Sequence, residues 1–205
     1  THSDSSAASD VYKRQPDDRS VTFTDLTNAV GVLVLAGPKA RDVLQKLTRT
    51  DLSSASFPWL SAKQIDVNLA PSVAARVNFV GELGWELHHP IEYQNHIFDA
   101  LMSAGVEFGL KPFGIRAMDA MRLEKSYRMV GTEMSIEYAA LESGLDRFVQ
   151  LQKPDFIGRS GLLAWQEKGF ANSFVTLEVK DTTDRDVIGG NPIFKEGKLI
   201  GRATS

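Results

Sequence analysis

Strand-type and helix-type hydrophobic patterns alternate along this chain of 205 residues, and that alternation constrains the fold more than any single motif. The apolar run GVLVLAG at 31–37 is typical of a buried strand. A helix is predicted directly after it, because Pro38 stands at a first helical position and four apolar residues follow at helical spacing. These residues are Ala40, Val43, Leu44 and Leu47. The chain is therefore predicted to combine sheet and helices, in the α+β class.

Further elements are predicted downstream, and they suggest a domain boundary. Helical patterns cover residues 90–105, 112–127, 141–149 and 159–168. Strand patterns follow as FVTLEV at 174–179 and as a hairpin in PIFKEGKLIGRATS at 192–205, turning at Glu196-Gly197. We place a boundary near residue 169, between a main region at 20–168 and the start of a β-rich domain at 169–205. Residues 1–19, rich in Ser and Asp, are predicted to be a disordered or non-native leader.

Composition excludes several classes of function. The chain has no cysteine, which excludes thiol nucleophiles, zinc ribbons, iron–sulfur clusters and disulfide frameworks. Its net charge of −3 provides no basic field for nucleic acid. The longest apolar stretch, at 29–36, is far shorter than a membrane span, and no signal peptide precedes it, so we expect a soluble protein of the cytoplasm.

The most informative local feature is the segment SVAARVNFVGELGWELHH at 72–89, which reads as a hairpin around GELG. With a four-residue loop, antiparallel pairing sets Phe79 opposite Glu86 and Val77 opposite His88, so an aromatic ring, a carboxylate and an imidazole share one face. Such a face suits a flat heterocycle that carries two adjacent N–H donors. The alternative is an ordinary hairpin with Glu86 facing water.

Charged residues recur along the predicted helix GIRAMDAMRLEKSYR. Arg116, Asp119 and Arg122 are spaced three apart, which favours a solvated ladder of ion pairs. Either arginine, held by Asp119, is also a candidate for binding a ligand carboxylate. No metal site is predicted, because His88 and His89 point to opposite faces of a strand. Nucleotide-binding and serine-hydrolase motifs are absent as well.

Five motifs in register make the chain resemble the aminomethyltransferase family, typified by the glycine-cleavage T-protein. They are GPKARDVLQKLT, RVNFVGELGWELHHP, FGIRAMDAMRLEKSYRMVGTEMS, ALESGLDRFVQLQKPDFIGR and GKLIGRATS, and together they span nearly all of 21–205. The segments RLEKSYR, ALESGL and KPDFIGR are most similar to the folate-binding C-terminal half of dimethylglycine and sarcosine dehydrogenases. The resemblance implies an aminomethyltransferase-like folate-binding fold with a truncated C-terminal β-barrel domain.

The resemblance also implies a tetrahydrofolate site. The family's pterin-binding glutamate matches Glu86, and its usual tyrosine seven residues earlier matches Phe79. The predicted cofactor-binding residues are Phe79, Trp85, Glu86, His88, Arg116 and Arg122. The family's catalytic aspartate lies upstream of GPKAR and Asp25 is not in the matching motif, so no catalytic residue is assigned. FAD would belong to the N-terminal half of the resembled dehydrogenases, which this chain does not contain.

Three functional hypotheses follow. The first is a tetrahydrofolate-binding segment of a flavin-dependent N-methyl amine dehydrogenase, capturing a one-carbon unit as 5,10-methylenetetrahydrofolate, with the isolated segment inactive. The second is a stand-alone folate-dependent aminomethyltransferase or methyltransferase. The third is a folate-binding regulatory module without catalysis. The expected partners are small molecules, namely the folate and the amine-derived one-carbon unit, and a eukaryotic source would place the protein in the mitochondrial matrix.

Overall fold

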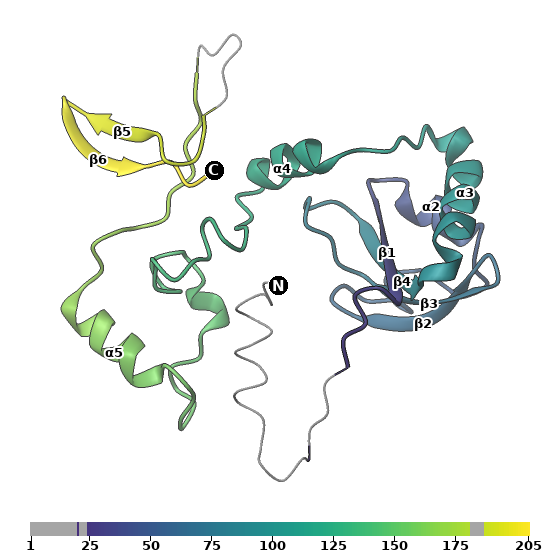
Figure 1. The fold of residues 1–205 in the computed structure, drawn as a ribbon, viewed down its shortest axis with the longest axis horizontal. Coiled ribbons are helices and arrows are strands. Elements are labelled where there is room, and N and C mark those ends of the chain that lie inside the picture. The colour runs from purple at the N-terminus through teal and green to yellow at the C-terminus, as the bar shows by residue number, and fades with distance from the viewer. Residues whose placement is uncertain (1–19, 21–23, 181–186) are drawn as a thin grey trace, which may run out of the picture. The chain divides into compact units, whose positions relative to one another are not determined.

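The computed structural model describes residues 20, 24–180 and 187–205, which divide into two compact units. The first unit is described over 24–77 and 83–110, and the second over 78–82, 111–180 and 187–205. The predicted leader at 1–19 lies outside the described residues. The mixed helix and sheet content confirms the predicted α+β class (Figure 1).

A four-stranded antiparallel sheet forms the first unit. Its order is β1-β4-β3-β2. The strands are β1 (Val30–Ala36), β2 (Ala62–Val67), β3 (Ala70–Ala75) and β4 (Gly84–Pro90). Helices α2 (Ala40–Gln45) and α3 (Gln94–Gly105) cover one face, with the short 3-10 helices η1 (Ile91–Tyr93) and η2 (Val106–Phe108) on either side of α3 (Figure 1).

The core lies between that face and the two helices. Side chains on alternate strand positions point into it, and Leu35, Leu87, Leu44 and Ile97 are all buried. The strand predicted at 31–37 and the helix after Pro38 are therefore confirmed. Helix α3 confirms the prediction at 90–105, and its Ile97 and Leu101 are buried.

The predicted hairpin register is wrong by four residues. Ala75, not Phe79, lies opposite Glu86, and Val73, not Val77, lies opposite His88. β3 stops at Ala75 because the side-chain oxygen of Asn78 then accepts the amide protons of Val80 and Glu82, which turns the chain away from the sheet. Glu86 and His88 share one face whatever the register, because they stand two residues apart on β4, whereas Phe79 is not part of a strand.

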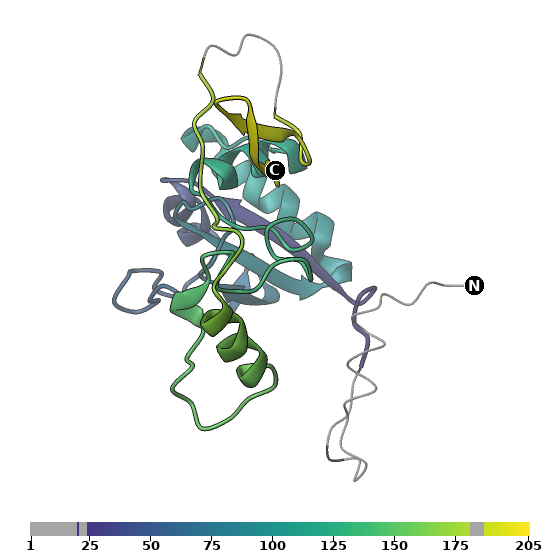
Figure 2. The same ribbon diagram turned by 90° about the vertical axis from the view of Figure 1, so that its left-hand side faces the viewer.

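The second unit contains helices α4 (Ile115–Glu124) and α5 (Arg159–Lys168), a short 3-10 helix η3 (Asp146–Phe148) and a hairpin of β5 (Pro192–Lys195) and β6 (Lys198–Arg202). Figure 2 shows the two hairpin strands side by side. Helix α5, α4 and this hairpin confirm the predictions at 159–168, 112–127 and 192–205.

Two predicted elements of the second unit do not form. The expected helix at 141–149 is a turn followed by η3, because Gly144 adopts a positive φ of 64° and interrupts the helical backbone. The expected strand at 174–179 pairs with no strand among the residues that the structure describes. Instead, the Phe174 amide donates to the carbonyl of Glu142, and the Arg128 guanidinium stacks on the Phe174 ring at 4.2 Å.

Candidate functional site

The face of the sheet opposite α2 and α3 carries the carboxylate and imidazole that the sequence singled out. Glu86 and His88 point from β4 to this open face, because Trp85, Leu87 and His89 on the alternate positions are buried. Val34 of β1 pairs with Glu86, and Val32 of β1 and Val73 of β3 flank His88. Val32 and Val34 are each 45% exposed, and Val73 is 40% exposed. The open face is therefore apolar around one polar pair.

The polar pair is in direct contact. The Nε2 atom of His88 lies 3.3 Å from Oε2 of Glu86, and the two side chains are 39% and 33% exposed. When Nε2 carries a proton it donates to the carboxylate, which fixes the orientation of Glu86. The other carboxylate oxygen, Oε1, has no hydrogen-bond partner among the described residues.

A hollow of about 640 Å³ adjoins this pair on the same unit. His88 lines it, together with Gln64, Asp66 and Thr50 and with apolar residues of β1 and β3, including Val30 and Val73. His88 therefore belongs both to the hollow and to the pair with Glu86. A flat molecule held by Glu86 has open space beside it on this face.

Trp85 lies on the other side of the sheet from Glu86. Its ring is fully buried and stacks on Phe57, with centroids 6.1 Å apart and planes 5° apart. Its indole N–H has no hydrogen-bond partner in the described part of the chain. Packing accounts for Trp85, and its predicted role in cofactor binding has no support from its position.

Phe79 lies in the second unit, on the turn that follows β3. Three contacts join this turn to the end of α4. The Phe79 ring lies 6.4 Å from the Tyr127 ring, and a carboxylate oxygen of Glu82 lies 3.7 Å from Nζ of Lys125. Gly81, with φ of +72°, passes so close to Lys125 that a Cβ there would lie 2.6 Å from its Cγ. Segments distant in sequence thus meet around Phe79.

The predicted surface ladder of ion pairs would leave Arg122 in contact with water. Arg122 is instead buried, with only 1% of it exposed. Its Nε donates to Asp119 at 2.7 Å, and its Nη1 donates to Glu133 at 3.1 Å and to the carbonyl of Tyr127 at 3.0 Å. A buried guanidinium that donates to three protein groups holds the protein together rather than a ligand. Arg116 is exposed and makes no ion pair with another described residue.

Glu133 is the centre of this network. Its carboxylate accepts bonds from the Met129 amide at 2.9 Å and the Thr132 hydroxyl at 2.7 Å, and also from Ser205. Burial by itself would raise the pKa of Glu133, but the hydrogen bonds from Ser205, Thr204, Met129 and Thr132 outweigh it and lower the pKa to about 2. Sequence reasoning missed this residue, because a single glutamate in a loop gives no sign of burial.

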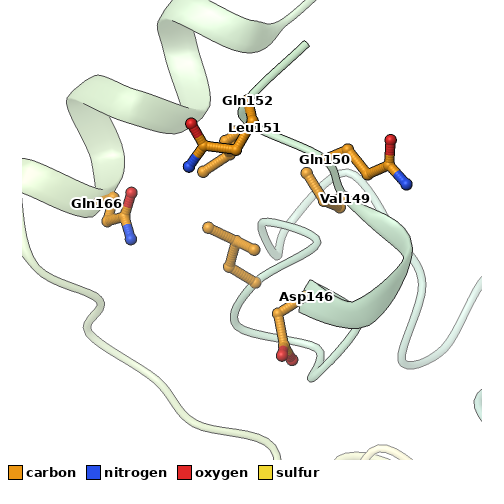
Figure 3. A pocket seen from close by; sticks show the side chains of 7 residues that line it. Asp146, Val149, Gln150, Leu151, Gln152 and Gln166 are labelled. Carbon is orange, nitrogen blue, oxygen red and sulfur yellow. The ribbon is translucent and has the colours of Figure 1, made fainter.

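Another hollow, of about 460 Å³, lies in the second unit beside η3 and α5 (Figure 3). Asp146 of η3 and Gln166 of α5 line it, and Gln150 and Gln152 come from the intervening loop. None of the predicted site residues lines it. Over the described residues, no cluster of three or more potential ligand side chains is placed to hold a metal ion, and no helix is long and apolar enough to cross a membrane.

Comparisons with known proteins find similarity to dimethylglycine dehydrogenases and to aminomethyltransferases. It is 45% identical over 186 residues to human mitochondrial dimethylglycine dehydrogenase, covering 90% of this chain and 21% of that protein. It is 36% identical over 188 residues to the aminomethyltransferase of Koribacter versatilis (strain Ellin345), covering 90% of this chain and 49% of that protein. The chain thus spans about a fifth of the dehydrogenase and half of the aminomethyltransferase.

Among solved structures, the heterotetrameric sarcosine oxidase from Corynebacterium sp. U-96 matches 44% of this chain and 45% of its own, with 27% identity and a TM-score of 0.39. The family described as the GCVT N-terminal domain matches residues 1–153. This match covers well over half of the sequence. The chain therefore belongs to the GCVT family.

Proposed function

We propose that this chain is the tetrahydrofolate-binding segment of a flavin-dependent N-methyl amine dehydrogenase of the dimethylglycine or sarcosine type. The observation that carries the proposal is the 45% identity to dimethylglycine dehydrogenase over nine-tenths of the chain, against 34–36% to the aminomethyltransferases. The FAD of that activity would be bound by another part of the enzyme. The mitochondrial relatives support a location in the mitochondrial matrix for a eukaryotic source.

The open face of the sheet fits the pterin ring of a folate. A pterin presents two adjacent N–H donors in the ring plane, and a carboxylate receives such a pair through two parallel bonds. Glu86 presents its carboxylate on a face lined by Val32 and Val34, which offer apolar contact to the ring. His88 holds the carboxylate from the side at 3.3 Å and leaves Oε1 without a partner among the described residues.

In this proposal the residues of the chain bind and orient, and they do not react. Tetrahydrofolate, when bound, supplies the nitrogen that takes up the one-carbon unit, giving 5,10-methylenetetrahydrofolate. Glu86 fixes the plane of the ring, and His88 fixes the plane of the carboxylate. When the acceptor nitrogen is held in one orientation next to a labile one-carbon unit, their reaction no longer needs a diffusional encounter. Capture by the folate then competes with escape of the one-carbon unit to water.

The test is a binding titration of tetrahydrofolate with the 205-residue chain and its Glu86→Gln variant. The amide keeps one acceptor oxygen but turns the other position into a donor that faces the donors of the ligand. Loss of a charge-assisted bond of about 1.5–3 kcal/mol raises the Kd roughly 10- to 150-fold. Calorimetry gives the Kd, and circular dichroism checks the fold.

The matched control is Glu92→Gln, which changes an exposed carboxylate at the start of η1 on the same unit. We expect its Kd to equal that of the unaltered chain. Equal affinities of Glu86→Gln and Glu92→Gln for tetrahydrofolate would contradict the assignment of Glu86 as the pterin-binding residue.

A stand-alone aminomethyltransferase is the second candidate, favoured by the match of the chain to about half the length of such enzymes at 34–36% identity. The two candidates differ in their need for an electron acceptor. Reduction of a dye by dimethylglycine or sarcosine, catalysed by a protein that contains this chain and carries flavin, supports the dehydrogenase. Folate-dependent aminomethyl transfer without flavin supports the alternative.

A further inference from the structure

We propose that Arg41 and Arg76, both in the first unit, form a binding site for an oxyanion that carries two negative charges. The ligand class is a phosphate group or a pair of carboxylates at the spacing of a glutamyl residue. This site does not depend on folate binding at Glu86. The Arg76 guanidinium lies 5.9 Å from the ring centroid of the buried Trp85, on the face of the sheet opposite Glu86.

The two guanidinium groups converge on a single hydroxyl. Nη2 of Arg41 donates to Oγ of Ser54 at 3.1 Å, and Nη2 of Arg76 donates to the same oxygen at 3.3 Å. Arg41 belongs to α2, Ser54 to the loop between α2 and β2, and Arg76 directly follows β3. Three segments that are separate in sequence therefore bring two positive charges to one point.

No carboxylate balances these two charges. Among residues 24–180 and 187–205, neither arginine of the pair forms an ion pair. The carboxylate of Asp51, in the same loop as the hydroxyl, instead accepts bonds from Ser53 and Ser56. Two guanidinium groups held together without a counter-charge repel each other. A bound anion with two negative charges supplies the partner that the pair lacks.

Each guanidinium also has an enclosed nitrogen without a partner. The Nε atoms of Arg41 and Arg76 are buried, and no group in the described part of the chain accepts their protons. An enclosed N–H group without an acceptor costs free energy. In this arrangement the Nη groups are aimed at Ser54, an exposed residue, where a ligand from solution can reach them. Binding of an anion there offsets the cost.

Arg76 is held in place before a ligand binds. Its amide donates to the carbonyl of Ser61 at 2.8 Å, and its carbonyl accepts the Leu60 amide at 3.3 Å. Its Nη1 donates to the carbonyl of Phe57 at 2.5 Å. A planar guanidinium fixed in this way matches the oxygens of a carboxylate or phosphate. Its fixed position also lowers the entropy that is lost when the ligand binds.

The test is a calorimetric titration of the 205-residue chain with inorganic phosphate and, separately, with glutarate, at one ionic strength set by sodium chloride. Tighter binding of phosphate assigns the site to a phosphoryl group, and tighter binding of glutarate assigns it to paired carboxylates. Loss of one charge-assisted contact in Arg41→Met raises the Kd of the preferred anion roughly 10- to 150-fold. Arg41→Lys keeps the charge without the planar fork, and its Kd rises less. Arg49→Met, a matched change of an exposed arginine in the same unit, leaves the Kd unchanged.

A spectroscopic measurement on the unaltered sequence separates contact with the anion from loss of folding. In protein with nitrogen-15 in its arginines, the Nε–H signals are assigned with Arg41→Met, Arg76→Lys and Arg49→Met. The preferred anion shifts the signals of Arg41 and Arg76 and leaves that of Arg49 in place. Unshifted signals of Arg41 and Arg76, equal Kd values of Arg41→Met and Arg49→Met, or absence of binding of both anions would overturn the site.

Discussion

The two units of this protein are stabilised by different chemistry. In the first unit, the sheet and its two helices enclose a continuous apolar cluster that includes Leu44, Phe57, Trp85 and Ile97. In the described part of the second unit, Val80 and Ala139 are the only buried apolar residues, whereas Arg122, Glu133 and Glu142 are all buried. A cavity in the packed core would therefore destabilise the first unit. Loss of one partner of a buried ionic or polar bond would destabilise the second unit.

The difference decides what holds the side chains of each unit in place. Glu86 and His88 rest on the rigid packed sheet, with every second side chain of β4 in the core. Phe79 and Tyr127 rest on the polar network, through the bonds of Arg122 to Tyr127 and to Glu133. The carboxylate is thus set by hydrophobic packing, and the aromatic pair by buried charge.

The largest effect is expected from breaking the network at Arg122. Arg122→Met leaves Glu133 as a buried charge without its partner, and we expect the second unit to lose about 3–5 kcal/mol of stability. Hydrogen exchange followed by mass spectrometry reports each unit separately, so the loss is expected at 115–145 and not in the sheet. Arg116→Met, a change of an exposed arginine on the same helix, is the control.

A paired replacement sharpens this result. Arg122→Met combined with Glu133→Leu removes both charges, and it should recover most of the stability that Arg122→Met loses. If the double variant were as unstable as the single one, the side chains would matter for their shape and not as an ion pair.

The next effect is expected from the apolar core of the first unit. Leu44 is fully buried against the sheet, and Leu44→Ala should cost about 3 kcal/mol through lost burial and the cavity that remains. Protection from hydrogen exchange should fall in β1, β4 and α3. Leu26→Ala, at a leucine that is 53% exposed, should change little. Equal loosening of both units by Leu44→Ala would mean that the two do not have separate sources of stability.

Sequence patterns predicted the elements that depend on neighbours along the chain. β1, α2, α5 and the β5–β6 hairpin follow from local periodicity, proline position and turn residues, and all four are present. The register of β3 and β4 was not predictable in the same way. It depends on the Asn78 side chain, which closes a turn where the alternation of apolar residues continues without a break.

The same distinction applies to the residues that the sequence singled out as candidate site residues. The shared face of Glu86 and His88 follows from the two-residue period of a strand and survives the error in register. The buried network of Arg122 and Glu133 in the second unit depends on contacts between residues 5 to 11 positions apart, set by loops without a repeating pattern. An arginine at helical spacing from an aspartate reads as a surface residue, and only the fold shows that it is buried.

The smallest effect is a pH dependence confined to the second unit. The pKa of Glu133 is about 2 in the folded protein, against an ordinary value of 4.5, so its carboxylate stabilises the fold above pH 4.5 and this contribution is lost as the pH falls toward 2. At pH 3 the loss is about 2 kcal/mol. Hydrogen exchange at pH 3, corrected for the intrinsic rate, should show loosening at 122–134.

The first unit provides the contrast for this measurement. The pKa of Asp51 is also lowered, by hydrogen bonds from Ser56 and Ser53, but Asp51 is exposed and can be protonated without burying an unpaired group. The sheet should therefore keep its protection at pH 3. Glu133→Gln tests the cause: the variant starts less stable at neutral pH and loses less on acidification. If Glu133→Gln lost as much stability at pH 3 as the unaltered chain, the acid sensitivity of the second unit would come from other carboxylates. The stability of this unit would then depend on bonds that do not require the charge of Glu133.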